Sequence, residues 1–193
     1  MHWTLKLKIM KNLNRSLMVV GCALSVFGTT PAFGNESNTQ SRVGVYDSRA
    51  VAYANFWSES SQKKLKDLMT SAKAAKESGD QVGYKAKEAA IRELQDKNHR
   101  QVFSTAPVDD ALGSVKDSLP EIKKQVKVDV LVSKWDSETL KQYKNAEQVD
   151  VTDQLVRKFI TPTEKQAKAI EELKKAKPVS PEKAEELIRN GKF

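Results

Sequence analysis

The stretch from Val126 to Phe159 constrains the fold of this 193-residue chain more than any other part of it. Valine occupies every second position from Val126 to Val132, and Trp135 closes the run. Side chains on a β-strand point alternately to its two faces, so this pattern predicts a strand with one buried face.

A second strand and a helix complete this unit. Residues 149–152 (VDVT) bring the chain back as a short strand, and Asp150 or Thr152 can cap the amphipathic helix that follows. Strands this short need a partner to bury their apolar face, and the best candidate is the distant segment 42–47 (RVGVYD). The sequence therefore predicts an α+β domain whose small β-body is assembled from distant segments.

Residues 1–34 have the three parts of a secretory signal peptide. Four basic residues lie between Lys6 and Arg15, an apolar run covers residues 17–27, and small residues occupy the −3 and −1 positions before a cleavage site after Gly34. The apolar run is shorter than the roughly 18 residues that a membrane-spanning helix needs. We therefore expect export to the periplasm with cleavage after Gly34.

A second interpretation treats residues 19–22 as a lipoprotein box with Cys22 lipidated. The apolar run continues beyond Cys22, which favours simple cleavage. Cys22 is the only cysteine of the chain, so the exported protein would have no disulfide. Its stability would then come from packing or oligomerisation.

Removal of residues 1–34 would leave 159 residues, enough for one domain with a hydrophobic core. The whole chain has a formal charge of +8, and the removed segment holds four basic and no acidic residues, so the remainder carries +4. This modest excess fits a solvated surface or weak contact with an anionic membrane surface. It does not indicate nucleic-acid binding.

Residues 35–41 are polar and are expected to form a disordered linker. A helix should begin after the strand 42–47, with Asp47 or Ser48 as its cap. This helix is apolar around most of its circumference and is expected to be deeply buried. Its large aromatic side chains indicate a core or a subunit interface; they are Tyr53, Phe56 and Trp57.

Residues 58–104 are predicted to form an antiparallel helical hairpin on a lysine-rich background. Gly79 suits the end of the first helix, and Asp80 can cap the second. The apolar positions recur at spacings of three and four and are mostly alanine, so the helices can approach closely while burying little area. Arms of about 20 to 25 residues would extend roughly 30 to 38 Å.

The remaining helices are predicted from their start signals. Pro107 breaks the hairpin's second helix, and Pro120 fits the first turn of a shorter helix that leads into the central strand. Residues 161–193 form a C-terminal helical extension, with helix starts at Thr163 and Ser180.

The sequence offers little support for catalysis. After residue 34 the chain has one histidine, His99, which we expect to be a solvated helix residue, and it has no cysteine. A His/Cys metal site therefore cannot be built, and no glycine-rich phosphate loop is present. Asp47 and Asp150 could supply the carboxylates of a small secreted enzyme, but their positions beside helix starts favour capping. We expect no enzymatic activity, no metal and no cofactor.

The order of the elements behind a signal peptide resembles the Skp (OmpH-like) family of periplasmic chaperones. The resemblance covers residues 42–160 and is carried by RVGVYDSRAVAYA at 42–54, VKVDVLVSKWD at 126–136 and VDVTDQLVRKF at 149–159. It implies a mostly helical α+β fold in which a small β-body carries a projecting antiparallel hairpin. The short hairpin would make this chain a divergent member. The resemblance also implies a homotrimer that surrounds unfolded outer-membrane proteins.

These considerations assign two sets of residues. Those expected in the β-body or oligomer interface are Val43, Val45, Tyr53, Phe56, Trp57, Val130, Val132, Trp135 and Val151. Those expected to contact clients on the hairpin are Leu65, Leu68, Met69, Lys73, Lys76, Val82, Lys85 and Leu94. The lysine-rich faces can be either plain solvated surface or a basic arm that attracts acidic partners.

The leading hypothesis is a periplasmic, ATP-independent holdase chaperone that binds unfolded envelope or outer-membrane proteins and no nucleic acid. The alternative is a non-enzymatic structural or adaptor protein of the cell envelope that binds one specific partner.

Overall fold

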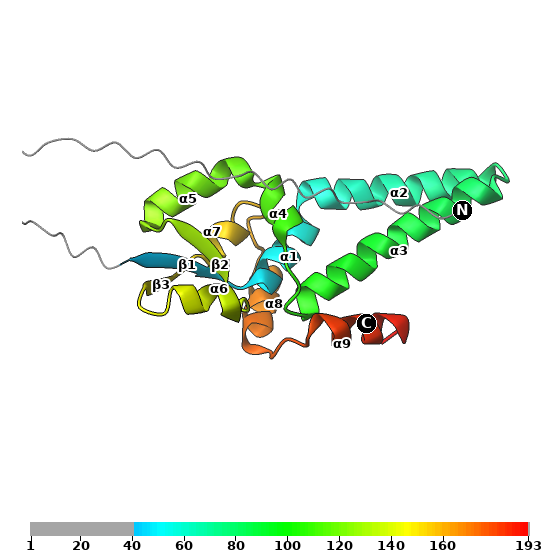
Figure 1. Cartoon of the computed structure of the whole chain (residues 1–193). Coiled ribbons are helices and arrows are strands. Elements are labelled where there is room, and N and C mark those ends of the chain that lie inside the picture. The colour runs from blue at the N-terminus through cyan, green and yellow to red at the C-terminus, as the bar shows by residue number, and fades with distance from the viewer. Residues whose placement is uncertain (1–40, 193) are drawn as a thin grey trace, which may run out of the picture. The chain divides into compact units, whose positions relative to one another are not determined.

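The structure, a computed structural model, describes residues 41–192. This part of the chain is mostly helical and contains one three-stranded sheet (Figure 1). The strands are β1 (Arg42–Tyr46), β2 (Val130–Ser133) and β3 (Glu147–Asp150). The helices are α1 (Ser48–Trp57), α2 (Glu59–Glu77), α3 (Gln81–Phe103), α4 (Asp109–Ser114), α5 (Leu119–Val126), α6 (Ser137–Gln142), α7 (Thr152–Val156), α8 (Glu164–Lys175) and α9 (Pro181–Arg189), with the 3-10 helix η1 (Lys116–Ser118) before α5. The expected signal peptide, Cys22 and residues 35–40 of the expected linker lie outside the described residues.

The sheet has the strand order β2-β1-β3, and both pairs are parallel. Val45 of β1 lies opposite Val132 of β2 and Asp150 of β3. The prediction that residues 42–47 supply the partner strand is therefore confirmed. The two later strands do not return alongside each other, because β1 lies between them. Parallel neighbours need long crossovers, which α1 to α5 provide between β1 and β2.

The prediction of a strand that starts at Val126 was wrong. Helix α5 runs through Val126 and ends at Lys127, whose φ of 56° is left-handed and whose N–H bonds to the carbonyls of Lys123 and Lys124. Only Val130–Ser133 are extended. Val128 is buried although it precedes the strand, so the alternation of valines reflects burial on both sides of a helix end.

Gly44 in the middle of β1 is required by close packing. A Cβ at this position would lie 2.7 Å from Cδ2 of Leu131 and 3.1 Å from Cγ2 of Val128. Real side chains do not approach so closely, so only glycine lets β2 and the chain before it lie against this face of β1.

Two groups of buried side chains hold the sheet to the helices. The larger group contains Tyr46, Val51, Ala52, Val102, Val108, Ala111, Ile122, Val151 and Leu155. The smaller group contains Ala50, Ala54, Val156 and Ile170. Tyr53 and Phe159 pack against both groups, so the two form one continuous core.

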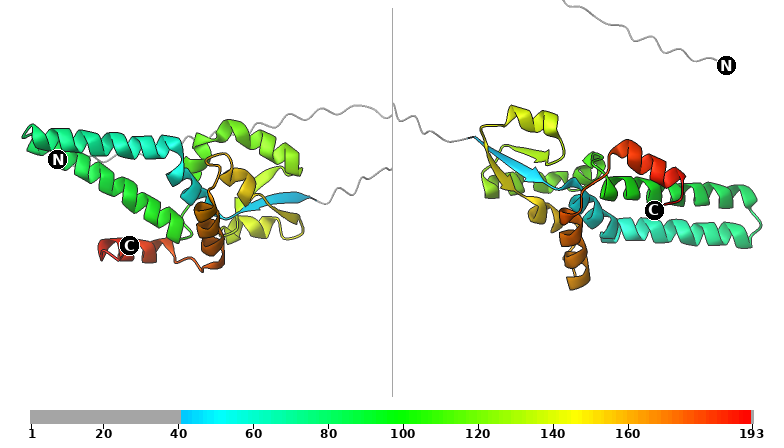
Figure 2. Two further views of the ribbon diagram at one scale, coloured as in Figure 1. Left: turned by 180° about the vertical axis from the view of Figure 1, so that it is seen from behind. Right: turned by 90° about the horizontal axis from the view of Figure 1, so that it is seen from below.

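Helices α2 and α3 leave this core side by side and extend away from the sheet (Figure 1). The views of Figure 2 show the same pair projecting from the remainder of the described chain. Gly79 ends α2 with a φ of 78°, and the Asp80 N–H bonds to the Ala75 carbonyl. Asp80 then caps α3 through its bond from Gly83 N. The cap and the turn were both correctly predicted from the sequence.

The C-terminal helices belong to the same packed unit. Ile170 of α8 is part of the smaller buried group, and α9 lies beside α3 (Figure 2). Thr163 caps α8 in a capping box with Gln166, and Ser180 caps α9, as their sequences indicate. Val179 between them bonds to Phe103 and Thr105 at the end of α3. None of the helices that the structure describes is long and apolar enough to cross a membrane.

Asp47 is the point where the strands and helices are joined. Its carboxylate accepts hydrogen bonds from the Arg49 guanidinium at 3.1 and 3.2 Å, from Lys134 Nζ at 2.7 Å and from Trp135 Nε1 at 3.1 Å, and it caps α1 through Arg49 N. The Asp47 N–H donates to Thr152 Oγ1, at the start of α7. We name Asp47, Arg49, Lys134 and Trp135 the Asp47 cluster.

The two oppositely charged residues at the centre of the Asp47 cluster are buried and paired with each other. Asp47 and Arg49 are each 1% exposed, and Arg49 also donates to the Ala176 carbonyl after α8. Burial alone would raise the pKa of Asp47. Hydrogen bonds from Arg49, Lys134 and Trp135 outweigh that effect and lower the pKa below its ordinary value.

The substitution Asp47→Asn tests this arrangement. It keeps the shape and capping ability of the side chain but leaves the buried Arg49 without its counter-charge, so urea unfolding at neutral pH should show a loss of about 3 kcal/mol. Because the native pKa is lowered, the charged form stabilises the fold above the ordinary aspartate pKa of about 3.9 and loses this effect as the pH falls through the native value. The difference between wild type and variant should therefore shrink only below about pH 4.

Asp150→Asn is the matched control, because Asp150 is exposed and the amide oxygen of asparagine can still accept the Thr152 N–H. Its effect should stay within about 0.5 kcal/mol. An Asp47→Asn variant as stable as this control would show that the Asp47 cluster does not hold the fold together.

Candidate functional site

An apolar groove lies between α1, α3 and α8, at the base of the projecting helices. Its volume is about 470 Å³. The apolar side chains that line it are Tyr53, Phe56, Trp57, Val102, Phe103, Ala169, Leu173 and Ala176. Polar side chains are fewer and include Asn98, His99, Glu172 and Lys177. A mostly apolar concave surface with a few polar groups at its border is typical of a binding site.

Helical periodicity brings the aromatic side chains of the groove together. Tyr53, Phe56 and Trp57 lie at spacings of three and four on α1, which places them on one face. The ring centroids of Phe56 and Trp57 are 5.4 Å apart and nearly perpendicular, and those of Tyr53 and Trp57 are 6.4 Å apart. On α3, His99 and Phe103 use the same spacing, with centroids 6.1 Å apart.

Two of these large side chains are open to solvent. Trp57 is 43% exposed and Phe103 is 42% exposed. Each exposed apolar Å² that a partner covers contributes about 25 cal/mol, so these rings favour the binding of another apolar group. Apolar side chains this large and exposed, gathered around one groove, are a stronger signal than isolated exposed residues.

The prediction that His99 is simply solvated was wrong. His99 is half-buried, lines the groove and packs its ring against Phe103. Sequence alone gave no reason to pair these residues with α1 or α8. Val102 and Phe103 follow His99 by three and four residues, which indicates that the three side chains share one face of the helix. This spacing does not identify the helix against which that face packs.

The residues expected in the β-body divide into two groups. Val43, Val132 and Val151 are buried within the single chain, while Val45 and Val130 are half-buried on the sheet. Their burial is already accounted for by intrachain packing. Trp135 is half-buried in the Asp47 cluster, where Arg49 and Lys134 lie 4.8 and 4.6 Å from its ring centroid. The aromatic residues of α1 line the groove, and Tyr53 also packs against the buried core.

The residues expected to contact clients are likewise divided. Leu65, Leu68 and Leu94 are half-buried on α2 and α3. Met69 is 57% exposed and Val82 is 82% exposed. Lys73, Lys76 and Lys85 are exposed; Lys73 pairs with Glu77, and Lys76 lies over the Tyr84 ring.

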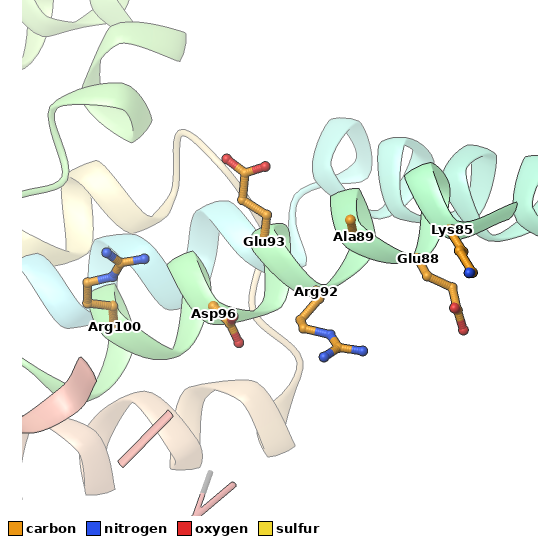
Figure 3. Close-up of a pocket in the computed structure, with 7 residues that line it drawn as sticks. All are labelled: Lys85, Glu88, Ala89, Arg92, Glu93, Asp96 and Arg100. Carbon is orange, nitrogen blue, oxygen red and sulfur yellow. The ribbon is translucent and has the colours of Figure 1, made fainter. Parts of the chain in front are cut away.

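A second hollow, of about 410 Å³, follows the outer side of α3 and is lined by Lys85, Glu88, Ala89, Arg92, Glu93, Asp96 and Arg100. Figure 3 shows charged side chains of both signs extending outward from this one helix. Such a mixed, open surface is typical of a solvated helix face. It offers no enclosed site, in contrast to the groove between α1, α3 and α8.

The acidic residues and the histidine of the described chain are candidates for a metal or acid–base site. In residues 41–192 no group of three or more His, Cys, Asp or Glu residues is placed to hold a metal ion. The Asp47 carboxylate accepts hydrogen bonds from Arg49, Lys134 and Trp135, and these bonds lower its pKa. A carboxylate with a lowered pKa is a weak general base. Asp150 uses one carboxylate oxygen to accept the Thr152 N–H.

Comparison of the chain with models of protein families, with curated proteins and with solved structures finds no match in any of the three. The case for a function therefore comes from the groove and the helices around it.

The groove can be tested with an environment-sensitive apolar dye such as bis-ANS. We expect the dye to bind the native protein, and the double substitution Trp57→Ala with Phe103→Ala to reduce its fluorescence about threefold or more, because the variant removes the two open rings. Met69→Ala, which removes an exposed apolar side chain of α2 outside the groove, is the matched comparison and should reduce the dye fluorescence much less. Equal fluorescence of all three proteins would contradict the groove as an apolar binding surface.

Proposed function

We propose that this protein is a non-enzymatic, periplasmic, ATP-independent holdase chaperone that binds apolar segments of unfolded envelope or outer-membrane proteins. The observation that carries the proposal is the aromatic groove at the base of α2 and α3, with Trp57 and Phe103 open to solvent. The expected signal peptide and the resemblance of residues 42–160 to the Skp family support the same proposal.

The strength of binding that the groove can provide fits transient holding. Burying one large apolar side chain contributes about 1.5–3 kcal/mol, which corresponds to roughly one to two orders of magnitude in affinity. A single such contact is released easily. A holdase needs contacts of this kind, because it must lower the concentration of the free unfolded chain without trapping it.

The projecting helices would extend this surface. α2 and α3 have 19 and 23 residues, which corresponds to about 28 and 34 Å of helix. Met69 and Val82 present apolar groups to solvent among lysines such as Lys73, Lys76 and Lys85. In the proposed mechanism the lysines attract acidic clients or an anionic membrane surface, and the apolar groups hold the chain. The pair would be the antiparallel hairpin of a Skp-like β-body.

The test is suppression of aggregation of an unfolded outer-membrane barrel, followed by light scattering after dilution from urea. We expect the purified protein at molar excess to reduce aggregation, and Trp57→Ala with Phe103→Ala to lose at least half of that effect. The double variant Met69→Ser with Val82→Ser measures how much of the aggregation suppression depends on the projecting helices α2 and α3. The Asp150→Asn protein serves as the control. No suppression by the wild-type protein would refute the holdase.

One observation favours the adaptor hypothesis: the groove is small and is bordered by three helices, α1, α3 and α8. A volume of about 470 Å³ between three helices admits a few side chains and suits a defined motif. An adaptor would bind one folded envelope protein tightly and saturably and would leave unfolded chains unaffected. Pull-down from native and from urea-unfolded envelope extracts separates the two functions.

The proposal includes a homotrimer, as the resemblance implies. Val43, Val132 and Val151 are buried within one chain, so the trimer interface would use more exposed surfaces, such as the aromatic face of α1. Light scattering of the purified protein should give three times the chain mass. If the protein is a monomer over a wide concentration range, no trimer surrounds the client, and the adaptor becomes the better candidate.

A further inference from the structure

Strand β2 forms one edge of the sheet, and its outer main chain is open. Tyr46 of β1 pairs with Ser133, and Lys134 N donates to the Tyr46 carbonyl at 2.8 Å. In a parallel pair this pattern turns the main-chain groups of Val130 and Val132 toward β1 and those of Leu131 and Ser133 outward. The Ser133 carbonyl accepts from Asp136 N. Within residues 41–192 no other hydrogen bond reaches the outward groups of Leu131 or the Ser133 N–H.

A cleft of about 490 Å³ runs along this edge. One wall is β2 itself, from Val130 to Ser133, and the opposite wall is formed by Pro107, which lies between α3 and α4, and by Asp109 at the start of α4. Tyr46, Trp135 and Asp136 close the end of the cleft where the strands finish. That end of the cleft lies at the carboxyl ends of β1 and β2, where the ligands of open parallel sheets commonly bind.

The cleft is acidic. Asp109 and Asp136 line it, and neither Arg49 nor Lys134 does, since both are held by Asp47 behind the Trp135 ring. Burial, followed by the negative charges of Asp109 and Asp136, raises the pKa of Tyr46 to about 12. Asp109 is exposed, and no hydrogen bond or ion pair found within residues 41–192 involves its carboxylate, whereas the Asp136 carboxylate accepts from Thr139 N and Thr139 Oγ1. This arrangement is complementary to a cation.

Ser48 adds an independent observation. It lines the cleft and is 1% exposed, and its Oγ is buried without a hydrogen-bond partner. A buried hydroxyl that makes no hydrogen bond costs free energy, so such groups are rare in folded proteins. The neighbouring Asp47 at the same strand end has all its partners within the chain.

We propose that this edge of the sheet is a second binding site, distinct from the apolar groove, which takes an extended peptide segment carrying a lysine or arginine side chain. The peptide pairs with the main chain of Leu131 and Ser133 as an added strand. Its cationic side chain enters the cleft between Asp109 and Asp136, and its polar groups satisfy Ser48. Main-chain pairing supplies register, and the two carboxylates select the cation.

The test uses the purified protein labelled with ¹⁵N and three peptides observed by NMR. The first is acetyl-Thr-Val-Lys-Val-Thr-amide, the second has norleucine in place of lysine, and the third is the lysine peptide with alternate amides N-methylated. We expect the first to shift the amide signals of Leu131 and Ser133, while Gln148 and Asp150 on the opposite edge of the sheet stay unchanged. Both other peptides should bind about fivefold or more weakly.

Two variants separate binding from folding. Asp109→Asn should weaken the lysine peptide about two- to fivefold and leave the norleucine peptide unaffected. Ser48→Ala should weaken the lysine peptide about fivefold without lowering the melting temperature, because the hydroxyl has no partner to lose.

Three results would overturn the proposal. One is the absence of amide shifts at Leu131 and Ser133 with the lysine peptide at millimolar concentration. Another is equal binding of the lysine and norleucine peptides, or shifts that n-butylamine alone reproduces. The third is a shift of the same amides on concentrating the protein without peptide, which would mean that a second copy occupies the edge. These measurements do not involve aggregation suppression. A negative result in the aggregation assay would therefore neither support nor refute peptide binding at this edge of the sheet.

Discussion

The hydrogen bonds and ion pairs of the Asp47 carboxylate connect the sheet to the helices around it. They join the end of β1 to the start of α1, to the turn after β2 and, through Arg49 and Ala176, to the end of α8. The neighbouring bond from Asp47 N to Thr152 adds the chain after β3. Segments more than a hundred residues apart are thus fixed around one buried charge. A buried charge is costly unless every partner is in place, so the cluster favours this one arrangement of strands over others.

The same junction positions the candidate sites. On one side, Arg49 in the first turn of α1 donates to the Ala176 carbonyl directly after α8, which ties together the two helices that border the aromatic groove. On the other side, Lys134 and Trp135 fix the end of β2, beside the acidic cleft. Apolar contact would be the main attraction at the groove, and charge and main-chain pairing at the edge. A protein with both surfaces can hold two different features of one polypeptide.

Much of the fold could be predicted because its signals are local. The caps at Asp47, Asp80, Thr163 and Ser180, and the left-handed turn at Gly79, depend on residues within one helical turn of each other. The pairing of residues 42–47 with the later strands was also predictable, because few other segments were apolar and extended. The start of β2 was not, because Val126 and Val128 are compatible with a helix end as well as with a strand. The parallel direction of the strands and the central position of β1 could not be predicted, because neither produces a pattern in the local sequence.

The sequence was sufficient to predict the type and approximate limits of most helices and the need for a distant strand. Only the tertiary structure decided that Tyr53, Phe56 and Trp57 meet His99 and Phe103 across a groove, and that Ser48 shares a cleft with Asp109 and Asp136. The physical reason is that periodicity defines which face of an element is apolar, whereas the partner of that face depends on how all elements pack at once. Residues of a binding surface are brought together by that packing and carry no spacing of their own in the chain.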